Sequence, residues 1–494
     1  MQFLGIDVGT GGSRAVLIDE NGVVTASATV EHIPIASPEI GWAEQSPEDW
    51  RRASFAAIRE VLADENVDAQ QIGAIGFSGQ MHGAVLLDKN DEVLRPALIW
   101  CDQRTEKQCA EITERIGAKN LIDLVANPAI TGFTLPKLLW VRENEPEIWK
   151  QVRAVLLPKD YVRFSLSGDK ASDVADASGT LLFDVKNRIW SKEMLAALQL
   201  DADLFPHAFE SIEITGTVSA KGASETGLIA GTPIVAGAGD NAAGAVGMGI
   251  VQVGMTSATI GTSGVIFVAT DEPKFDLHGR IHTLCHAIPN RWHNTGVTLA
   301  AGLSLKWFRE NFGDGENFDD LTANAAKISS GSEGAIWLPY LMGERAPHLD
   351  PNARAAFIGL TASHTKAHLT RAVMEGVAFS LRDSLEIFKE SGAKIEKIRI
   401  GGGGAKSTLW RQIQADIYGQ TVQTIEAEEG AAFGAAILAG VGVGAWKMVA
   451  EACEKTIRVK QEIQPNNDAL KLYDEQFKVY QALYPALRSV LHKN

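Results

Sequence analysis

The chain has 494 residues, too many for one ordinary hydrophobic core, and this length predicts two domains of somewhat over 200 residues each. Apolar residues make up 45% and charged residues 22%, as in globular and not disordered proteins. With 46 basic and 61 acidic side chains the net charge is −15, which argues against nucleic acid and anionic membranes as main partners.

The remaining composition points to a cytoplasmic protein. The four cysteines have no CxxC spacing, so structural zinc and a disulfide framework are disfavoured and we expect reduced thiols. The start of the chain has neither a basic segment nor a long apolar one, and no signal peptide is predicted. The uncharged run 241–270 is broken by glycines and polar side chains, which indicates buried sheet and tight turns instead of a membrane span.

The first elements are predicted to form a β-meander. Strands are expected at 3–6, 13–18 and 23–30, and Asn21-Gly22 is a strong hairpin signal between the last two. The turn from Asp7 to Ser13 is rich in glycine, and its exposed N–H groups would suit a phosphate. The alternative is a plain glycine-rich hairpin.

A helix is predicted from Pro47, with Ser46 as its cap and Asp49 at the capping-box spacing. The apolar residues that follow at helical spacing indicate a face packed in the core.

Polar residues then follow two short apolar runs. The predicted buried strand 72–77 leads into Met81 and His82, and a later run leads into Trp100 and Asp102. Polar side chains at the end of a buried strand often line a site in α/β folds. Met81, His82, Trp100 and Asp102 are therefore candidates for ligand contact. The alternative is that they are core residues whose polar groups are hydrogen-bonded within the protein.

Asp240 stands alone in the middle of the chain. It is the only charged residue between Leu228 and Thr270, and an apolar surrounding makes a lone carboxylate costly. One interpretation is a cap on a small-residue helix that follows a strand at 233–236. The other is catalysis, which the neighbouring glycines favour because they let a ligand approach the backbone closely.

The second half opens as the first does. Strands predicted at 256–260 and 265–269 flank the turn 261–264, which again reads Gly-Thr. Two such hairpins suggest an ancient duplication and could clamp a polyphosphate from both sides. Later, a strand at 398–400 leads into a glycine turn at 401–404 and a helix, without a GxGxxG or P-loop motif. A small-residue helix suited to close packing is predicted at 429–436.

Two longer motifs complete the pattern. The first consists of Thr134, Lys137, Trp140 and Glu143-Asn144, and the second runs from Ala355-x-Phe357-x-Gly359-Leu360 to His368-Leu369-x-x-Ala372-Val373-Met374-Glu375. Over nearly its whole length the chain resembles the FGGY carbohydrate kinases, in the superfamily of ATPases that includes actin and the heat-shock chaperones. The resemblance implies an α/β fold with two actin-like (ribonuclease H-like) domains, 1–246 and 247–494, flanking a central catalytic cleft.

Further segments, 79–83, 157–161, 239–244, 338–340 and 343–345, look like those of the family's ketopentose kinases. The implied reaction transfers the γ-phosphoryl group of MgATP to the 5-hydroxyl of D-xylulose. Ribulose, another ketose or a polyol remains an alternative substrate, and a nucleotide-switched binding module of the actin or chaperone type an alternative class. Homodimerisation stays open.

The resemblance also implies roles for individual residues. Asp240 would be the catalytic base and Asp7 would act on the Mg²⁺ ion. The sugar would be contacted by Met81, His82, Asp240 and Asn241, with Trp100 and Asp102 nearby. ATP would be held by Thr10, Gly11, Gly12, Ser13, Gly261, Thr262 and Ser263 at its phosphates and by Gly402, Gly403, Gly404, Ala405, Ser407 and Thr408 at its adenosine. Gly11-Gly12 replaces the more usual Ser-Gly type of loop of the family. This departure bears on the stiffness of the loop and not on its assignment to phosphate binding.

Overall fold

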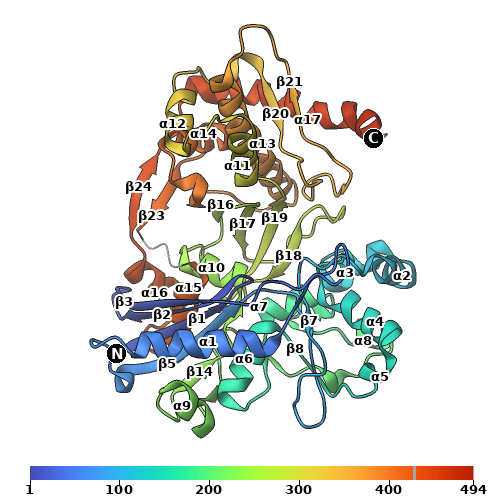
Figure 1. The fold of residues 1–494 in the computed structure, drawn as a ribbon, viewed down its shortest axis with the longest axis vertical. Helices are drawn as coiled ribbons and strands as arrows, with labels where there is room; N and C mark the ends of the chain where they lie inside the picture. The colour runs from blue at the N-terminus through green and yellow to red at the C-terminus, as the bar shows by residue number, and fades with distance from the viewer. Residues whose placement is uncertain (427–429, 493–494) are drawn as a thin grey trace.

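Two seven-stranded mixed sheets organise the chain, one in each of two lobes (Figure 1). The computed structural model describes residues 1–426 and 430–492. The first sheet has the order β13-β14-β5-β1-β2-β3, with β15 also paired to β5. Its strands are β1 (Gln2–Val8), β2 (Gly12–Asp19), β3 (Val24–Glu31), β5 (Ile72–Gly79), β13 (Ile214–Thr217), β14 (Pro233–Val235) and β15 (Ala238–Gly239).

The second sheet has the order β18-β19-β17-β16-β22-β23-β24. Its strands are β16 (Met255–Ile260), β17 (Gly264–Thr270), β18 (His282–Cys285), β19 (Trp292–Thr298), β22 (Lys397–Gly402), β23 (Val422–Ile425) and β24 (Val459–Ile463). Short two-stranded pairs complete the β-structure: β4 (Glu44–Gln45) with β7 (Ala97–Leu98), β6 (Val85–Leu87) with β8 (Ala154–Leu156), β9 (Ser172–Asp173) with β12 (Ala208–Phe209), β10 (Phe183–Asp184) with β11 (Ile189–Trp190), and β20 (Ile336–Leu338) with β21 (Ala356–Ile358).

The two sheets repeat one pattern. Strand β1 is antiparallel to β2 and parallel to β5, and strand β16 is antiparallel to β17 and parallel to β22. The Gly-Thr turns join β1 to β2 and β16 to β17, so the two sheets share this arrangement, and the ancient duplication itself stays a prediction. All of the strands predicted around these turns are confirmed within one or two residues.

Helices cover the sheets. Helix α1 packs on β2 and β3, and α13 packs on β17 and β19. In the first half the helices are α1 (Pro47–Leu62), α2 (Glu106–Ile116), α3 (Ala118–Val125), α4 (Thr134–Asn144), α5 (Pro146–Trp149), α6 (Pro158–Ser167), α7 (Val174–Ala177), α8 (Lys192–Leu198), α9 (Ala220–Thr226) and α10 (Asp240–Gly247). In the second half they are α11 (Gly302–Phe312), α12 (Phe318–Ala325), α13 (Lys366–Glu390), α14 (Thr408–Tyr418), α15 (Gly430–Gly442), α16 (Val449–Thr456) and α17 (Asn467–Leu491).

Helix α1 begins at Pro47 as predicted, but the capping box is wrong. Ser46 occupies the cap position without a side-chain hydrogen bond. The Asp49 carboxylate instead accepts a hydrogen bond from the backbone N–H of Ile33 at 2.7 Å and pairs with Arg52 at 2.7 Å. The Asp49 side chain, which the local spacing assigned to the capping box, therefore binds the loop after β3 instead.

Helix α15 returns from the second half of the chain to the first sheet. It packs on β1, β5 and α10, and a β-carbon at Gly434 would lie 1.8 Å from the Ala243 carbonyl oxygen. On the other side, a β-carbon at Gly5 would lie 1.9 Å from the Ala432 carbonyl oxygen. This confirms the predicted close packing of the small-residue helix; its predicted first residue, Glu429, is outside the described residues.

The division at 246/247 stays a prediction, because part of the second half completes the core beneath the first sheet. Phe3 and Val235 share one apolar cluster with Phe433 and Trp446. Among the described residues, no helix is long and apolar enough to cross a membrane.

Candidate active site

Three neighbouring strands end at one edge of the first sheet. Strands β1, β5 and β15 are parallel, and their register places Asp7 beside Ser78 and Ser78 beside Ala238. Asp240 follows β15 directly and is the first residue of α10, which lies between the two lobes (Figure 1). The fold thus brings Asp7 and Asp240 to the same edge.

These two carboxyl groups influence each other. Burial, and next the negative charge of Asp7, raise the pKa of Asp240 to about 7. Burial also raises the pKa of Asp7, against the opposing effects of the neighbouring Ser78 side chain and the charge of Arg14. A carboxyl group that titrates near neutral pH is ionised often enough to accept a proton and basic enough to hold it, which suits a general base.

Asp240 does not cap its helix, so the capping interpretation is wrong. Gly239 occupies the cap position and no side chain accepts a hydrogen bond there. A negative charge in the first turn is still favoured by the helix dipole. The carboxylate of Asp240 therefore remains available for a ligand.

Asp7 has the chemistry that a magnesium ion needs. Its Oδ1 atom is buried and has no hydrogen-bond partner among the described residues, although buried polar atoms are nearly always paired. Magnesium is usually held by one or two carboxylates together with substrate phosphates. The unpaired oxygen of Asp7 fits such an ion.

His82 is held in an uncommon backbone conformation, with φ at 70°, which in a non-glycine residue often marks a functional site. Its Nδ1 atom lies 2.7 Å from the carbonyl oxygen of Gly179, so Nδ1 carries the hydrogen. Burial, and next the charge of Lys137, hold the pKa of His82 well below its usual value. The ring is therefore neutral, and Nε2 presents a lone pair that can accept a hydrogen bond from a hydroxyl group.

The first signature motif holds His82 in place. Lys137 is fully buried, and its Nζ atom lies 3.1 Å from the carbonyl oxygens of both His82 and Phe133 and also bonds that of Gly132. The Thr134 hydroxyl donates to the same His82 carbonyl at 3.1 Å. Burial lowers the pKa of Lys137 to about 7. The motif thus fixes the backbone of the candidate sugar-binding histidine, a role that the spacing alone did not reveal.

Other predicted sugar contacts gather near Asp240. Met81 packs against Gly239, where a β-carbon would lie 2.6 Å from its Cγ atom. The Asn241 amide lies 3.7 Å from the sulfur of Met81. Trp100 is 44% exposed and donates its indole N–H to the Thr10 hydroxyl at 2.9 Å, which ties it to the first Gly-Thr turn.

Asp102 is placed differently. It is fully buried, accepts the backbone N–H of Ala43 at 2.7 Å and pairs with Arg104 at 2.8 Å. Because both oxygens already have partners, this arrangement gives no support to the predicted contact between Asp102 and a sugar.

Each Gly-Thr turn is closed by a backbone hydrogen bond from its first glycine, which spans three residues in the first turn and two in the second. Gly9 N–H donates to the Gly12 carbonyl at 3.0 Å, and Gly261 N–H donates to the Ser263 carbonyl at 2.9 Å. Gln45 further bonds the Thr10 carbonyl at 2.8 Å. Each turn is therefore a fixed loop whose remaining N–H groups are available to an anion.

Ser13 lies behind the first turn and not on it. Its side chain is fully buried, accepts a hydrogen bond from Ser54 at 2.8 Å and lies 2.9 Å from His32 Nε2. The hydroxyl of Ser13 thus belongs to the core, and its predicted phosphate contact has no support from this position.

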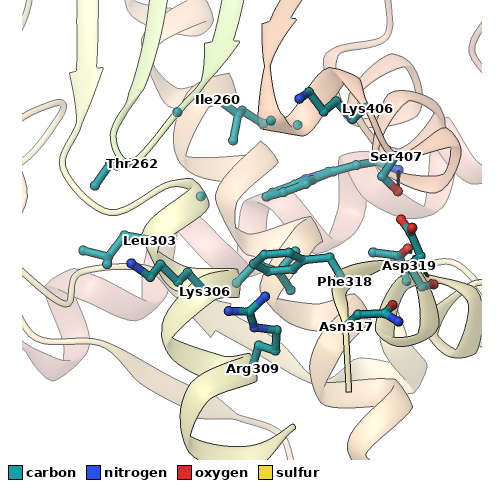
Figure 2. Close-up of a pocket in the computed structure, with 17 residues that line it drawn as sticks. Ile260, Thr262, Leu303, Lys306, Arg309, Asn317, Phe318, Asp319, Lys406 and Ser407 are labelled. Atoms are coloured by element: carbon teal, nitrogen blue, oxygen red, sulfur yellow. Dashed lines mark hydrogen bonds between the residues drawn. The ribbon is translucent and has the colours of Figure 1, made fainter. Parts of the chain in front are cut away.

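A cavity of about 590 Å³ opens beside the second turn (Figure 2). Five of the predicted nucleotide-binding residues line it: Gly261, Thr262, Gly403, Gly404 and Ser407. Several further lining residues carried no motif in the sequence, among them Leu303, Lys306, Arg309, Asn317, Phe318 and Asp319. Figure 2 shows Lys406 and Ser407 on one wall and Arg309 on the opposite one, where its guanidinium lies 4.1 Å from the centre of the Phe318 ring.

A second cavity of about 660 Å³ runs between α10 and the second sheet. Asp240, Asn241, Thr259, Gly402 and Ala405 are among its lining residues, and it shares Lys406 with the first cavity. Thr408 lines neither cavity and bonds Arg411 at 2.9 Å. The glycine turn after β22 therefore separates a cavity that can enclose a flat ring from one that reaches Asp240.

Comparison with known proteins gives this arrangement a class. Residues 2–247 match the N-terminal domain of the FGGY family of carbohydrate kinases, and residues 256–443 match its C-terminal domain. The chain belongs to this family, and its two-lobed α/β fold is the predicted actin-like ATPase fold.

Individual relatives are similar over almost their whole length. The xylulose kinase of Bacillus subtilis is 41% identical over 97% of this chain and 96% of its own. The solved structure of the ligand-bound xylulose kinase from Lactobacillus acidophilus has a TM-score of 0.94 and 28% identity, covering 100% of this chain and 99% of that one. A gluconate kinase from the same organism, 27% identical, covers 100% and 99% of the two chains with the same TM-score of 0.94, so the fold does not set the sugar.

Proposed function

We propose that this protein is a xylulokinase, which transfers the γ-phosphoryl group of MgATP to the 5-hydroxyl of D-xylulose and releases ADP. The observation that carries the proposal is Asp240, a carboxyl group with a pKa of about 7 at the edge where the candidate sugar and nucleotide sites meet. In its ionised form it orients the sugar hydroxyl and accepts its proton as the phosphoryl group arrives.

The first lobe binds the sugar. His82 Nε2 accepts a hydrogen bond from a sugar hydroxyl, because its Nδ1 already donates to Gly179. Met81 and Asn241 border the same space beside Asp240. Loss of such bonds from a polar substrate weakens binding by about 1–3 kcal/mol each.

The nucleotide lies across both lobes. Its adenosine occupies the cavity between the glycine turn at 403–404 and Phe318, and its phosphates lie against the two Gly-Thr turns. Asp7 would hold a magnesium ion, which would neutralise phosphate charge. The N–H groups of the turns orient the phosphoryl group toward Asp240 and share its charge.

A substrate panel tests this proposal. ADP release would be followed with D-xylulose, D-ribulose, L-ribulose, glycerol and gluconate, and the product would be identified by mass spectrometry and phosphorus NMR. We expect D-xylulose to give the highest kcat/KM and a 5-phosphate product, and EDTA to abolish turnover. A higher kcat/KM with another sugar would show that the chain is a kinase of the same family with a different substrate. ATP hydrolysis that none of the sugars stimulates would instead indicate a nucleotide-switched binding module.

A further inference from the structure

Side chains of the first lobe bond the edge of the second sheet. Strand β18 is last in the strand order of that sheet, so one side of its backbone has no neighbouring strand among the described residues. The Asn127 side chain accepts the N–H of Thr283 at 3.2 Å and donates to the carbonyl of the same residue at 2.8 Å. The Ser178 hydroxyl accepts the N–H of Cys285 at 3.1 Å. Alternate residues of a strand direct their N–H groups to the same edge, so Asn127 and Ser178 take the place of a neighbouring strand.

This contact between the lobes is buried. Asn127 and Thr283 are fully buried, and so is Ser178 except for 1% of its surface. Cys285 shares one apolar cluster with the apolar residues of α7. Helix α7 and the short 3-10 helix that follows it, Ser178–Thr180, both pack on β18 (Figure 1). Because a buried N–H without a partner is costly, these bonds favour the one placement of the lobes in which all of them form.

The residue after Ser178 fixes His82. The Gly179 carbonyl accepts a hydrogen bond from His82 Nδ1 at 2.7 Å. The packing is close, because a β-carbon on Gly179 would lie 2.6 Å from Cε1 of His82 and 3.0 Å from Cε of Met81. Ser178 also donates to the Ala175 carbonyl at 2.6 Å, which attaches it to α7. One short turn therefore contacts the second lobe through Ser178 and the candidate sugar-binding histidine through Gly179.

A second path of contacts leads from β18 to the same histidine. His282 Nδ1 lies 3.3 Å from the Asn127 Oδ1 atom. The centre of the His282 ring is 5.4 Å from that of Phe133, which in turn is 4.7 Å from that of His82. The side chain of Asn127 thus holds both the backbone of β18 and the ring that β18 packs toward the sugar site.

We infer that Ser178, supported by Asn127, is a positioning residue that couples the sugar site to the second lobe. The nucleotide contacts a Gly-Thr turn in each lobe and so favours one placement of the lobes. The sugar needs His82 in the position that Gly179 fixes, and Gly179 is held there when β18 is bonded to Ser178. Two ligands that favour the same arrangement raise each other's affinity by the same factor. This assignment rests on the proposed function for the places of the sugar and the nucleotide.

Sugar binding with and without nucleotide tests the coupling. The Kd of D-xylulose would be measured by calorimetry, alone and with a saturating nonhydrolysable ATP analogue and Mg²⁺, and the ratio of the two values is the coupling factor. Ser178→Ala removes the acceptor of the Cys285 N–H. Asn127→Leu removes both bonds to Thr283 at a similar side-chain size.

Ser167→Ala is the matched control. Ser167 is also a buried serine of the first lobe. Its hydroxyl donates to the Arg163 carbonyl at 3.1 Å and accepts the N–H of Asp169 at 3.0 Å. It therefore makes the same two kinds of bond as Ser178, but both of them stay within one lobe.

We expect the analogue to tighten D-xylulose binding by the parent about 5-fold or more, the lower end of common allosteric couplings. In Ser178→Ala and in Asn127→Leu this factor should fall to about 2 or less, while the Kd of the analogue measured without sugar stays at the parental value. Ser167→Ala should keep the parental factor. Melting temperatures would be measured for all four proteins.

A parent without coupling, or a Ser178→Ala variant that keeps the parental factor, would overturn the assignment. A lower melting temperature with an unchanged factor would show that Ser178 is only structural. If Ser178→Ala does not fold, Asn127→Leu decides by the same ratio. A parent that phosphorylates no ketopentose would refute the proposed function instead, whereas an active parent with unaltered coupling in the variants refutes only the role of Ser178.

Discussion

Replacing Asp240 with Asn separates catalysis from structure. Asn keeps the size and polarity of the side chain but cannot accept the proton of the sugar hydroxyl. We expect Asp240→Asn to bind MgATP and to lose phosphoryl transfer by about 10²-fold or more, the usual contribution of a general base. In the parent, kcat/KM should rise with pH through about 7 and then level off, because only the ionised form of Asp240 accepts the proton.

The same variant should be more stable than the parent at high pH. The folded state raises the pKa of Asp240 from 3.8 to about 7, which corresponds to roughly 4 kcal/mol of destabilisation by the ionised group. Removing the charge should therefore raise the free energy of unfolding by roughly 4 kcal/mol at pH 8.

The sign of the pH dependence follows from the raised pKa. Above pH 7 the carboxylate is ionised in both the folded and the unfolded state, so its full destabilising effect is present. As the pH falls from 7 toward 4, the folded state takes up a proton that the unfolded state does not, and the difference between parent and variant disappears.

Urea denaturation at pH 8 and at pH 5, turnover with D-xylulose and ATP titration would measure all of these effects. A variant with near-parental turnover would remove Asp240 from the role of base. If the variant is inactive but its gain in stability over the parent is no larger at pH 8 than at pH 5, the folded state does not oppose the ionisation of Asp240 and the electrostatic reasoning is wrong.

Three more predictions concern the supporting structure. Lys137→Met removes the bonds to the His82 carbonyl; it should raise KM for D-xylulose several-fold and leave KM for ATP near the parental value in the same kinetic assay. Gly434→Ala places a β-carbon 1.8 Å from a carbonyl oxygen of α10 and should destabilise the protein by about 1–3 kcal/mol in urea, whereas Gly244→Ala, with nothing within 4 Å of its β-carbon, should not; equal stabilities would refute the close helix contact. Phe318→Ala should raise KM for ATP but not for the sugar, and an unchanged KM for ATP would exclude this cavity as the adenosine site.

Local patterns in the sequence located several elements, whereas the two-domain actin-like fold was predicted from the resemblance to a family. Short apolar runs and the Asn21-Gly22 turn located the first strands, and Pro47 located the start of α1. These features depend on the conformational preferences of a few neighbouring residues. The lone charge at Asp240 was visible in the same way, because it depends only on which residues surround it in the chain.

Whether a polar side chain faces the cleft or the core depends instead on partners that are distant in the chain. Ser13 ends a glycine-rich turn and Asp102 follows the same kind of apolar run as His82, yet Ser54 and Ala43 pair them within the core. Their sequence neighbourhoods could not distinguish these outcomes.

The electrostatics of the site also come from long-range contacts. The pKa of Asp240 responds to Asp7 because β1 and β15 end at one edge of the sheet. Phe318 reaches its cavity from a segment that carried no motif in the sequence, and α15 crosses back to complete the first core. Burial and charge interactions depend on distances in space, which are fixed only when segments remote in the chain pack together.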